Sequence, residues 1–192
     1  MKKSKLESAE TRRRIVRTAA AEFRRNGING TGLSDLMAAA GLTHGGFYRH
    51  FGSKDQLVAE ACSAAMESVA EAMEATAAHR PAKKNRLQAI AERYLSMDHR
   101  DDRSDGCPLA GLGSELARSD DSTRAAATAG FLKLVDAVAG ESGRTTKPGV
   151  AKARALVALS AMIGAVTMSR IVTDSKLSAA ILQQTKKHLA NT

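Results

Sequence analysis

The chain has 192 residues, and its 29 Lys and Arg against 20 Asp and Glu give a formal net charge of +9. This length predicts one large domain, or a small domain joined to a larger one. The 43% hydrophobic and 26% charged residues exclude a disordered chain. The charge-free apolar stretch 155–169 is shorter than the ~20 residues of a membrane span, and no hydrophobic segment follows the basic residues at the start. We therefore expect no membrane segment and no secretory signal.

The cysteines and histidines are too widely spaced for a metal site or a disulfide framework. Cys62 and Cys107 lie 45 positions apart, and the five histidines show no metal-ligand spacing. The sequence also contains no phosphate-binding glycine loop and no paired-carboxylate motif. We therefore expect a reduced, cytoplasmic protein that has no catalytic residues and needs no metal or cofactor.

The positive charge is concentrated near the N-terminus. Residues 1–55 contain 11 Lys and Arg against 5 Asp and Glu, whereas residues 56–192 contain 18 against 15. This distribution is expected of a nucleic-acid-binding module joined to a nearly neutral body. By charge alone, a solvated basic face is an equally good explanation.

Helical periodicity runs along the whole chain, and strand signals are almost absent, which predicts an all-α fold of about nine helices. The first helix is expected over residues 9–26, because Ile15, Ala19 and Phe23 recur on one face and Gly27 can end the helix in the left-handed conformation. Two short helices joined across Gly41 should follow, and together they have the shape of a helix-turn-helix.

Ser53 and Gln56 form a capping-box pattern, which predicts a long helix from residue 53 to about residue 79. Further helices are expected at about 83–98, 108–117, 121–138, 150–172 and 175–190. The charged stretch 99–106 and the Gly/Ser/Thr/Pro-rich stretch 140–149 are expected to be loops. We divide the chain into an N-terminal helix-turn-helix domain, residues 1–53, and a larger helical body, residues 54–192.

The second short helix has an unusual composition for a structural helix. Gly45 and Gly46 together cost about 1.5–2 kcal/mol of helix propensity relative to alanine, but glycine lets the backbone approach DNA closely. Around them lie side chains that can hydrogen-bond phosphates or base edges. These are Thr43, His44, Tyr48, Arg49 and His50, with Lys54 at the start of the following helix. The pattern favours a helix that enters the major groove.

A resemblance to a known family rests on these same residues. The first helix ends Phe23-x-x-x-Gly27, Thr31 precedes the second helix, and the run 41–54 reads GLTHGGFYRHFGSK. In this order the segments resemble the DNA-binding domain of TetR-family transcriptional regulators. The resemblance covers about 50 residues in unbroken order.

The resemblance implies a role for each matching position. Phe47 and Phe51 would be core residues, and Tyr48 and Lys54 would contact phosphates. Thr43 would cap the recognition helix and touch a phosphate, His44 and Gly45 would lie nearest the base edges, and Arg49 and His50 would flank the DNA backbone. Gly32 and Gly46 depart from the family pattern, where polar residues are common, so DNA shape is expected to carry more of the specificity.

Beyond residue 57 only the architecture resembles the family, in which the body binds a small molecule and the last two helices form a dimer. The sequence supports the dimer independently through an apolar stripe and small residues on the two C-terminal helices. The stripe consists of Leu156, Leu159, Ile163 and Val166, with Leu177, Ile181 and Leu189 on the final helix. Two ordinary core helices would give the same pattern.

Three residues of the body are candidates for ligand contact. Tyr94 and Phe131 are the only aromatics outside residues 23–51, and they are the best candidates for the wall of a pocket. Cys107 precedes a predicted helix N-terminus, where the helix dipole would lower the pKa of its thiol. A reactive or ligand-sensing Cys107 is therefore possible, although a buried cysteine is the commoner case.

These observations predict a homodimeric repressor that a small molecule releases from a palindromic operator in double-stranded DNA. Ligand binding between the body helices is expected to move the long helix and change the separation of the two recognition helices. Two alternatives stay open. One is an architectural DNA-binding protein without a ligand, and the other is a thiol-based redox or electrophile sensor that uses Cys107.

Overall fold

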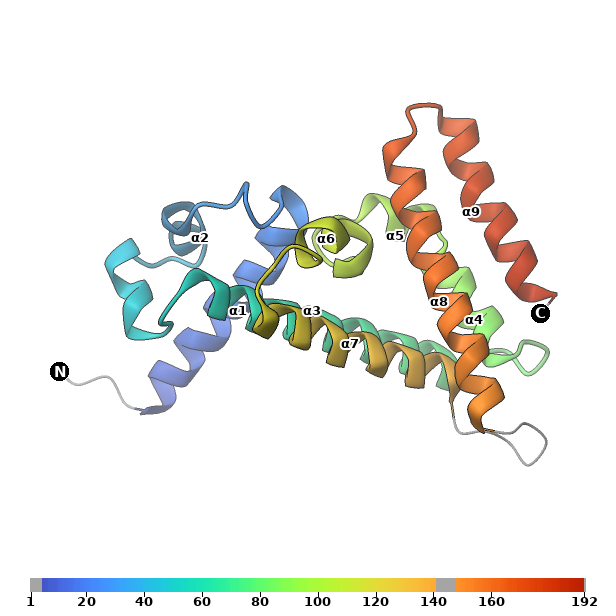
Figure 1. Ribbon diagram of the computed structural model, residues 1–192, viewed down its shortest axis with the longest axis horizontal. Coiled ribbons are helices and arrows are strands. Elements are labelled where there is room, and N and C mark those ends of the chain that lie inside the picture. The colour runs from blue at the N-terminus through green and yellow to red at the C-terminus, as the bar shows by residue number, and fades with distance from the viewer. Residues whose placement is uncertain (1–4, 141–147, 192) are drawn as a thin grey trace.

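A computed structural model describes residues 5–140 and 148–191, and within these ranges it contains helices and no strand, which confirms the all-α prediction. The molecule is elongated, with the N-terminal helices at one end and the two C-terminal helices at the other (Figure 1). The predicted connector 140–149 lies largely outside the described residues.

The N-terminal unit has three helices that surround one small apolar core. They are α1 (Lys5–Asn26), α2 (Leu33–Ala39) and the short 3-10 helix η1 (His44–Arg49). Gly27 ends α1 with a φ of 83°, and Gly41 connects α2 to η1 with a φ of 69°, both in the left-handed region that favours glycine. The predicted end of the first helix and the predicted turn at Gly41 are thus confirmed.

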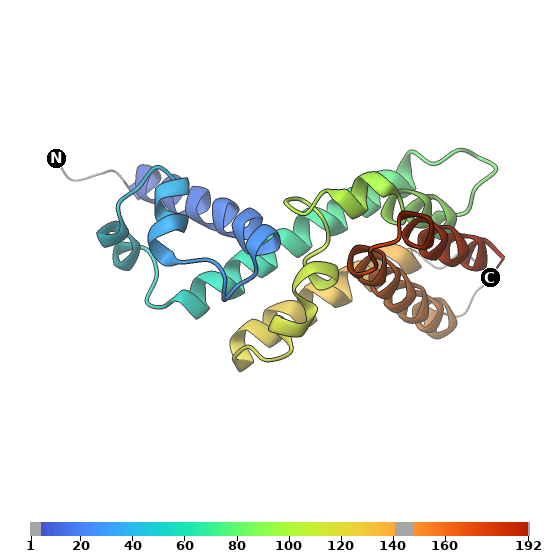
Figure 2. The same cartoon turned by 90° about the horizontal axis from the view of Figure 1, so that it is seen from above.

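The body is built on two long helices that lie side by side in both views (Figures 1 and 2). These are α3 (Lys54–Ala78) and α7 (Asp121–Ala139), which make the most extensive helix–helix contact in the described structure. The other body helices are α4 (Arg86–Tyr94), α5 (Met97–Asp101), α6 (Pro108–Leu116), α8 (Pro148–Ile171) and α9 (Ser175–Ala190).

The contact between α3 and α7 depends on a glycine. A Cβ added at Gly130 of α7 would lie 2.6 Å from Cβ and Cγ of Met66 on α3, closer than packed carbon atoms approach. Met66 is fully buried, and the apolar core continues without a break from Ile15 in α1 to Leu189 in α9. The first domain and the body therefore share a core through α3.

The structure differs from the predicted helix boundaries between residues 83 and 106. The segment expected as one helix over 83–98 is two helices, α4 and α5, because Ser96 caps a new helix by accepting a hydrogen bond from the backbone N–H of His99. The expected loop 99–106 is correspondingly shorter, since α5 extends to Asp101. The described residues therefore contain ten helices rather than nine.

Candidate functional site

The helix η1 presents the polar residues of the sequence motif to solvent. Thr43, His44, Gly45, Tyr48 and Arg49 are exposed, and His50 is half-buried. A Cβ added at Gly45 would meet no atom within 4 Å, so the backbone itself is open to a close approach at this position. The motif residues thus gather on one uncovered segment of the N-terminal unit.

Aromatic packing, rather than helix propensity, holds η1 in place. Phe47 is fully buried and stacks on Phe51 with 5.5 Å between the ring centroids, and it meets the Tyr48 ring edge-to-face at 5.1 Å. The Arg12 guanidinium lies 4.3 Å from the centroid of the Phe51 ring on its other side. Because Gly45 and Gly46 disfavour an α-helix, the segment forms a 3-10 turn anchored by Phe47.

Two motif side chains are placed differently from the expectation. Thr43 occupies the N-cap position of η1 but makes no side-chain capping hydrogen bond, so its hydroxyl does not cap the helix. Lys54 donates from Nζ to the carbonyl oxygens of Ile28 and Thr31, each at 2.7 Å. Lys54 therefore ties the loop before α2 to the start of α3. The ammonium group has three donors, and a phosphate contact by the third stays a prediction.

The predicted cap of the long helix is confirmed in part. The Ser53 hydroxyl accepts a hydrogen bond from the N–H of Gln56 at 3.1 Å, whereas the Gln56 side chain accepts from the N–H of Gly52 rather than from that of Ser53. The N-terminus of α3 is therefore fixed directly after η1. Lys54 and η1 are therefore both positioned by the N-terminus of α3.

The two C-terminal helices lie at the end of the molecule opposite η1 (Figure 2), and they leave an apolar face uncovered. Of the predicted stripe, Leu159 and Val166 are fully buried in the chain's own core and Leu189 is also buried, which corrects their assignment to a dimer face. The exposed large apolar residues of these two helices are Val150, Leu156, Val157, Met168, Ile171 and Leu177. A Cβ added at Gly164 on α8 would meet nothing within 4 Å, so another helix can approach closely there.

This uncovered face explains the apolar character of α8. Gly149–Ile171 is long and apolar enough to cross a membrane by length and composition, with a mean hydropathy of 1.5 and 33% of its residues buried within the chain. The expectation of no membrane segment rests on the shorter charge-free stretch 155–169. Core helices of soluble proteins can be as long and as apolar as α8, and α8 packs against α7 and α9.

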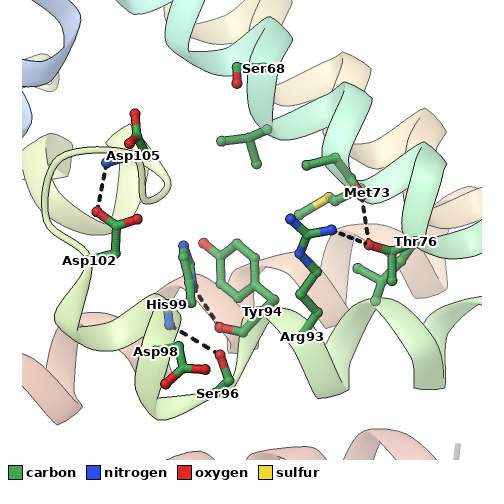
Figure 3. A pocket seen from close by; sticks show the side chains of 13 residues that line it. Ser68, Met73, Thr76, Arg93, Tyr94, Ser96, Asp98, His99, Asp102 and Asp105 are labelled. Atoms are coloured by element: carbon green, nitrogen blue, oxygen red, sulfur yellow. Dashed lines mark hydrogen bonds between the residues drawn. The ribbon is translucent and has the colours of Figure 1, made fainter.

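A cavity of about 410 Å³ lies between α3, α4, α5 and the loop that follows α5 (Figure 3). Its wall has an apolar side, to which Val69, Met73 and Ile90 contribute, and a polar side. The polar side consists of Ser68, Thr76, Arg93, Tyr94, Ser96, Asp98, His99, Asp102 and Asp105. This volume lies within the usual range of small-molecule sites.

Of the three predicted ligand residues, the structure brings only Tyr94 to the cavity wall. Cys107 is buried behind it, and Phe131 on α7 is partly buried against the core elsewhere. His99, Asp102 and Asp105 of the polar wall lie in the stretch 99–106, which the sequence predicts to be a solvent loop. The sequence feature that could indicate these cavity residues is the clustering of Asp102 and Asp105 near His99 in a short segment. A solvated loop would show the same clustering.

Cys107 has the environment of the commoner case, a buried cysteine, and not that of a reactive thiolate. Its side chain is buried, and burial raises the pKa of the Cys107 thiol although α6 begins at the next residue. The desolvation of the thiolate therefore outweighs the helix dipole. This favours a thiol that is neutral at pH 7 over the low-pKa thiolate that a sensor requires.

His99 connects the floor of the cavity to the start of α6. Its Nδ1 lies 2.6 Å from the carbonyl oxygen of Tyr94, and its Nε2 accepts a hydrogen bond from the N–H of Cys107 at 3.1 Å. Since Nε2 must accept, the proton of the neutral ring is on Nδ1, which donates to Tyr94. Burial lowers the pKa of His99, and the nearby Arg170 lowers it further.

We expect this histidine to make the protein less stable at mildly acidic pH. The unfolded chain binds a proton on His99 at its ordinary pKa of about 6.5, whereas the folded protein binds it only at lower pH. The contribution of neutral His99 to the free energy of unfolding should therefore be fully present above about pH 6.5. It should decrease as the pH falls below that value. Urea denaturation at several pH values measures this, and the non-ionisable variant His99→Asn should show a weaker pH dependence. An identical dependence in both proteins would contradict the assignment.

The loop after α5 (the cavity loop) is also bonded to α1 in the N-terminal unit. On α1, Arg24 donates from Nη1 to the carbonyl oxygen of Gly106 at 3.2 Å and lies 3.4 Å from the Asp105 carboxylate through Nη2. The neighbouring Arg25 donates to the Ser104 hydroxyl at 2.8 Å. One residue of the cavity wall, Asp105, and two of its neighbours in the loop are therefore in direct contact with α1.

Two family models match this chain in consecutive segments. Residues 15–61 match the model described as bacterial regulatory proteins, tetR family. Residues 81–187 match the model described as the C-terminal domain of LmrA/YxaF-like transcriptional regulators. The first match contains η1, and the second contains most of the cavity wall, all of α8 and most of α9.

Individual relatives agree with these matches. A TetR transcriptional regulator from Chloroflexus aurantiacus J-10-FL has a similar structure, with a TM-score of 0.76, 31% identity, and coverage of 97% of this chain and 95% of that one. An uncharacterized HTH-type transcriptional regulator of Mycobacterium tuberculosis is 29% identical over 170 residues, which are 85% of this chain and 86% of that protein. The probable acrEF/envCD operon repressor of Escherichia coli K12 is 41% identical over 59 residues, but this match spans only 27% of its length.

Proposed function

This chain belongs to the TetR family of transcriptional regulators. We propose that it is a homodimeric repressor that binds one palindromic operator and dissociates from it when a small molecule binds. We further propose that it acts in the cytoplasm. The observation that carries the DNA-binding part is η1, where exposed hydrogen-bonding residues surround an open backbone at Gly45. The cavity between α3 and α5 supports the ligand-binding part.

The dimer is proposed to form through α8 and α9. Operators with two-fold symmetry present half-sites in successive major grooves, ~34–36 Å apart, so two recognition segments are needed for tight binding. The uncovered apolar face of α8 and the exposed Leu177 of α9 would be buried by a second copy. A symmetric interface of this kind contacts the same patch of both copies.

Release is proposed to act through the contacts between the cavity loop and α1. A ligand in the cavity would shift the loop that holds Arg24 and Arg25, together with the long helix α3. Since α1 and α3 support η1, the distance between the two recognition segments would change. A dimer with the same distance between its η1 segments in the free and ligand-bound states would contradict this mechanism.

Two substitutions in η1 are expected to separate base recognition from phosphate contact. Tyr48→Phe should weaken binding to every duplex and reduce the slope of log affinity against log salt, because it removes a phosphate contact. His44→Ala should instead change which sequences are bound, because His44 is proposed to lie at the base edges.

The measurement is selection from a random duplex library by each variant, followed by titrations at several salt concentrations. Both side chains are exposed, so the free energy of unfolding should change by less than about 0.5 kcal/mol. An unchanged sequence preference in His44→Ala would refute its role as a base reader. An architectural protein would yield no enriched sequence with any variant.

A further inference from the structure

The cavity carries a charge opposite to that of the chain. Three carboxylates, those of Asp98, Asp102 and Asp105, line it together with a single guanidinium, that of Arg93, in a chain with a net charge of +9. His99 adds no positive charge at pH 7, because burial lowers its pKa. The wall as a whole therefore favours a positively charged ligand.

The carboxylates of the loop are incompletely neutralised. Asp102 uses Oδ1 to accept the N–H groups of Ser104 and Asp105, each at 3.0 Å. It forms no close ion pair among the described residues, although the guanidinium groups of Arg24 and Arg170 are near enough to attract it. Asp105 has one distant partner, Arg24, at 3.4 Å, and its side chain is 83% exposed. Arg93 keeps its positive charge, but its guanidinium donates to the Thr76 hydroxyl rather than to these carboxylates (Figure 3).

A second observation points to a ligand at the same place. The Tyr94 residue is only 5% exposed, yet its hydroxyl makes no hydrogen bond of ordinary geometry with any residue that the structure describes. Figure 3 shows the hydroxyl end directed toward the hollow between α3 and the loop of Asp102 and Asp105. The Cys107 thiol lies close enough to raise the pKa of Tyr94 further, after burial, but makes no hydrogen bond of ordinary geometry with it. A buried hydroxyl without a partner is costly unless a ligand or water supplies one.

We propose that the ligand of this cavity is an organic cation with an apolar body. The apolar body would lie on Val69, Met73 and Ile90, and the positive group would lie between the Asp102 and Asp105 carboxylates and the Tyr94 ring. An aromatic ring beside two carboxylates is a favourable site for an organic cation. This inference rests on the proposed function and specifies the chemical class of its effector.

The same site offers a direct route to release. A cation held by Asp105 competes with the Arg24 guanidinium for one carboxylate. The contact between α1 and the cavity loop is weakened when the ligand takes Asp105. The Asp105 carboxylate would therefore both favour a cationic ligand and couple its binding to the contact with α1.

The test compares two ions of the same shape and opposite charge by isothermal titration calorimetry with the full chain. Tetraphenylphosphonium is expected to bind at least about 10-fold more tightly than tetraphenylborate. The overall charge of +9 favours the borate, so this preference must arise locally. Asp102→Asn and Asp105→Asn should each weaken phosphonium binding several-fold. Asn at position 102 retains the oxygen that accepts the loop N–H groups, so the loop is preserved.

Asp121→Asn is the matched control, because it removes one carboxylate of α7 that is outside the cavity wall. It should leave phosphonium binding unchanged. Equal binding of the two ions, no binding of the phosphonium, or equal effects of the three variants would overturn the inference. DNA selection with the same samples tests the proposed function separately. A protein that enriches an operator but shows no cation preference disproves only the ligand class, and a cation-binding protein that enriches no operator disproves only the regulator.

Discussion

Phe47→Ala is expected to lower the free energy of unfolding of the DNA-binding end by about 3–5 kcal/mol and to abolish operator binding. Phe47 is fully buried and joins η1 to the core through its contacts with Phe51 and Tyr48. A 3-10 segment that contains Gly45 and Gly46 has little intrinsic stability. Removing the anchor should therefore release η1 as well as leave a cavity.

Urea denaturation and operator titration of the same variant measure the two effects. Tyr48→Ala is the matched control, because the neighbouring Tyr48 is 65% exposed. It should change the free energy of unfolding by less than about 0.5 kcal/mol and still weaken DNA binding. A Phe47→Ala protein that retains both its stability and its operator affinity would contradict the proposal that Phe47 anchors η1.

Val157→Glu is expected to convert the dimer into monomers and to reduce operator affinity by about 10²–10⁴-fold. Val157 is 69% exposed on α8, at the centre of the proposed interface. Association would bury two carboxylates there, at a large desolvation cost. The loss of affinity follows because a monomer can occupy only one half-site at a time.

Sedimentation velocity measures the oligomeric state, and titration with a two-half-site duplex measures the affinity. Leu132→Glu provides a control, since Leu132 is an exposed apolar residue, 43% exposed, on α7 and outside the proposed interface. This variant should remain dimeric and bind DNA normally. A dimeric Val157→Glu protein would show that the subunits associate through another surface.

Local sequence signals predicted the helices and their ends well where a single side chain determines them. Gly27 takes the left-handed conformation as expected, Gly41 joins the two short helices as expected, and Asp120 caps α7. The break at Ser96 was missed because the apolar period continues through it, and the cap becomes visible only once the hydrogen bond from His99 is known. Periodicity cannot separate one helix from two helices that pack on the same core.

The candidate site was predictable to the extent that it is contiguous in sequence. The motif around Gly45 is one such segment, and its exposed residues were identified from composition. The cavity is assembled from α3, α4 and the loop after α5, which no local pattern brings together. The prediction of the dimer face was wrong in part for a related reason. Periodicity marks an apolar stripe, but tertiary packing decides that Leu159 points inward and Val157 outward.

The affinity of the protein for its selected operator, relative to a random duplex of the same length, tests the central proposal most directly. Both duplexes are titrated at the same salt concentration, because phosphate contacts alone make all DNA affinities depend on salt. A specific dimeric regulator is predicted to prefer the operator by about 10³-fold or more. A ratio close to one, or the failure of any sequence to be enriched, would contradict the proposal that η1 reads a defined operator.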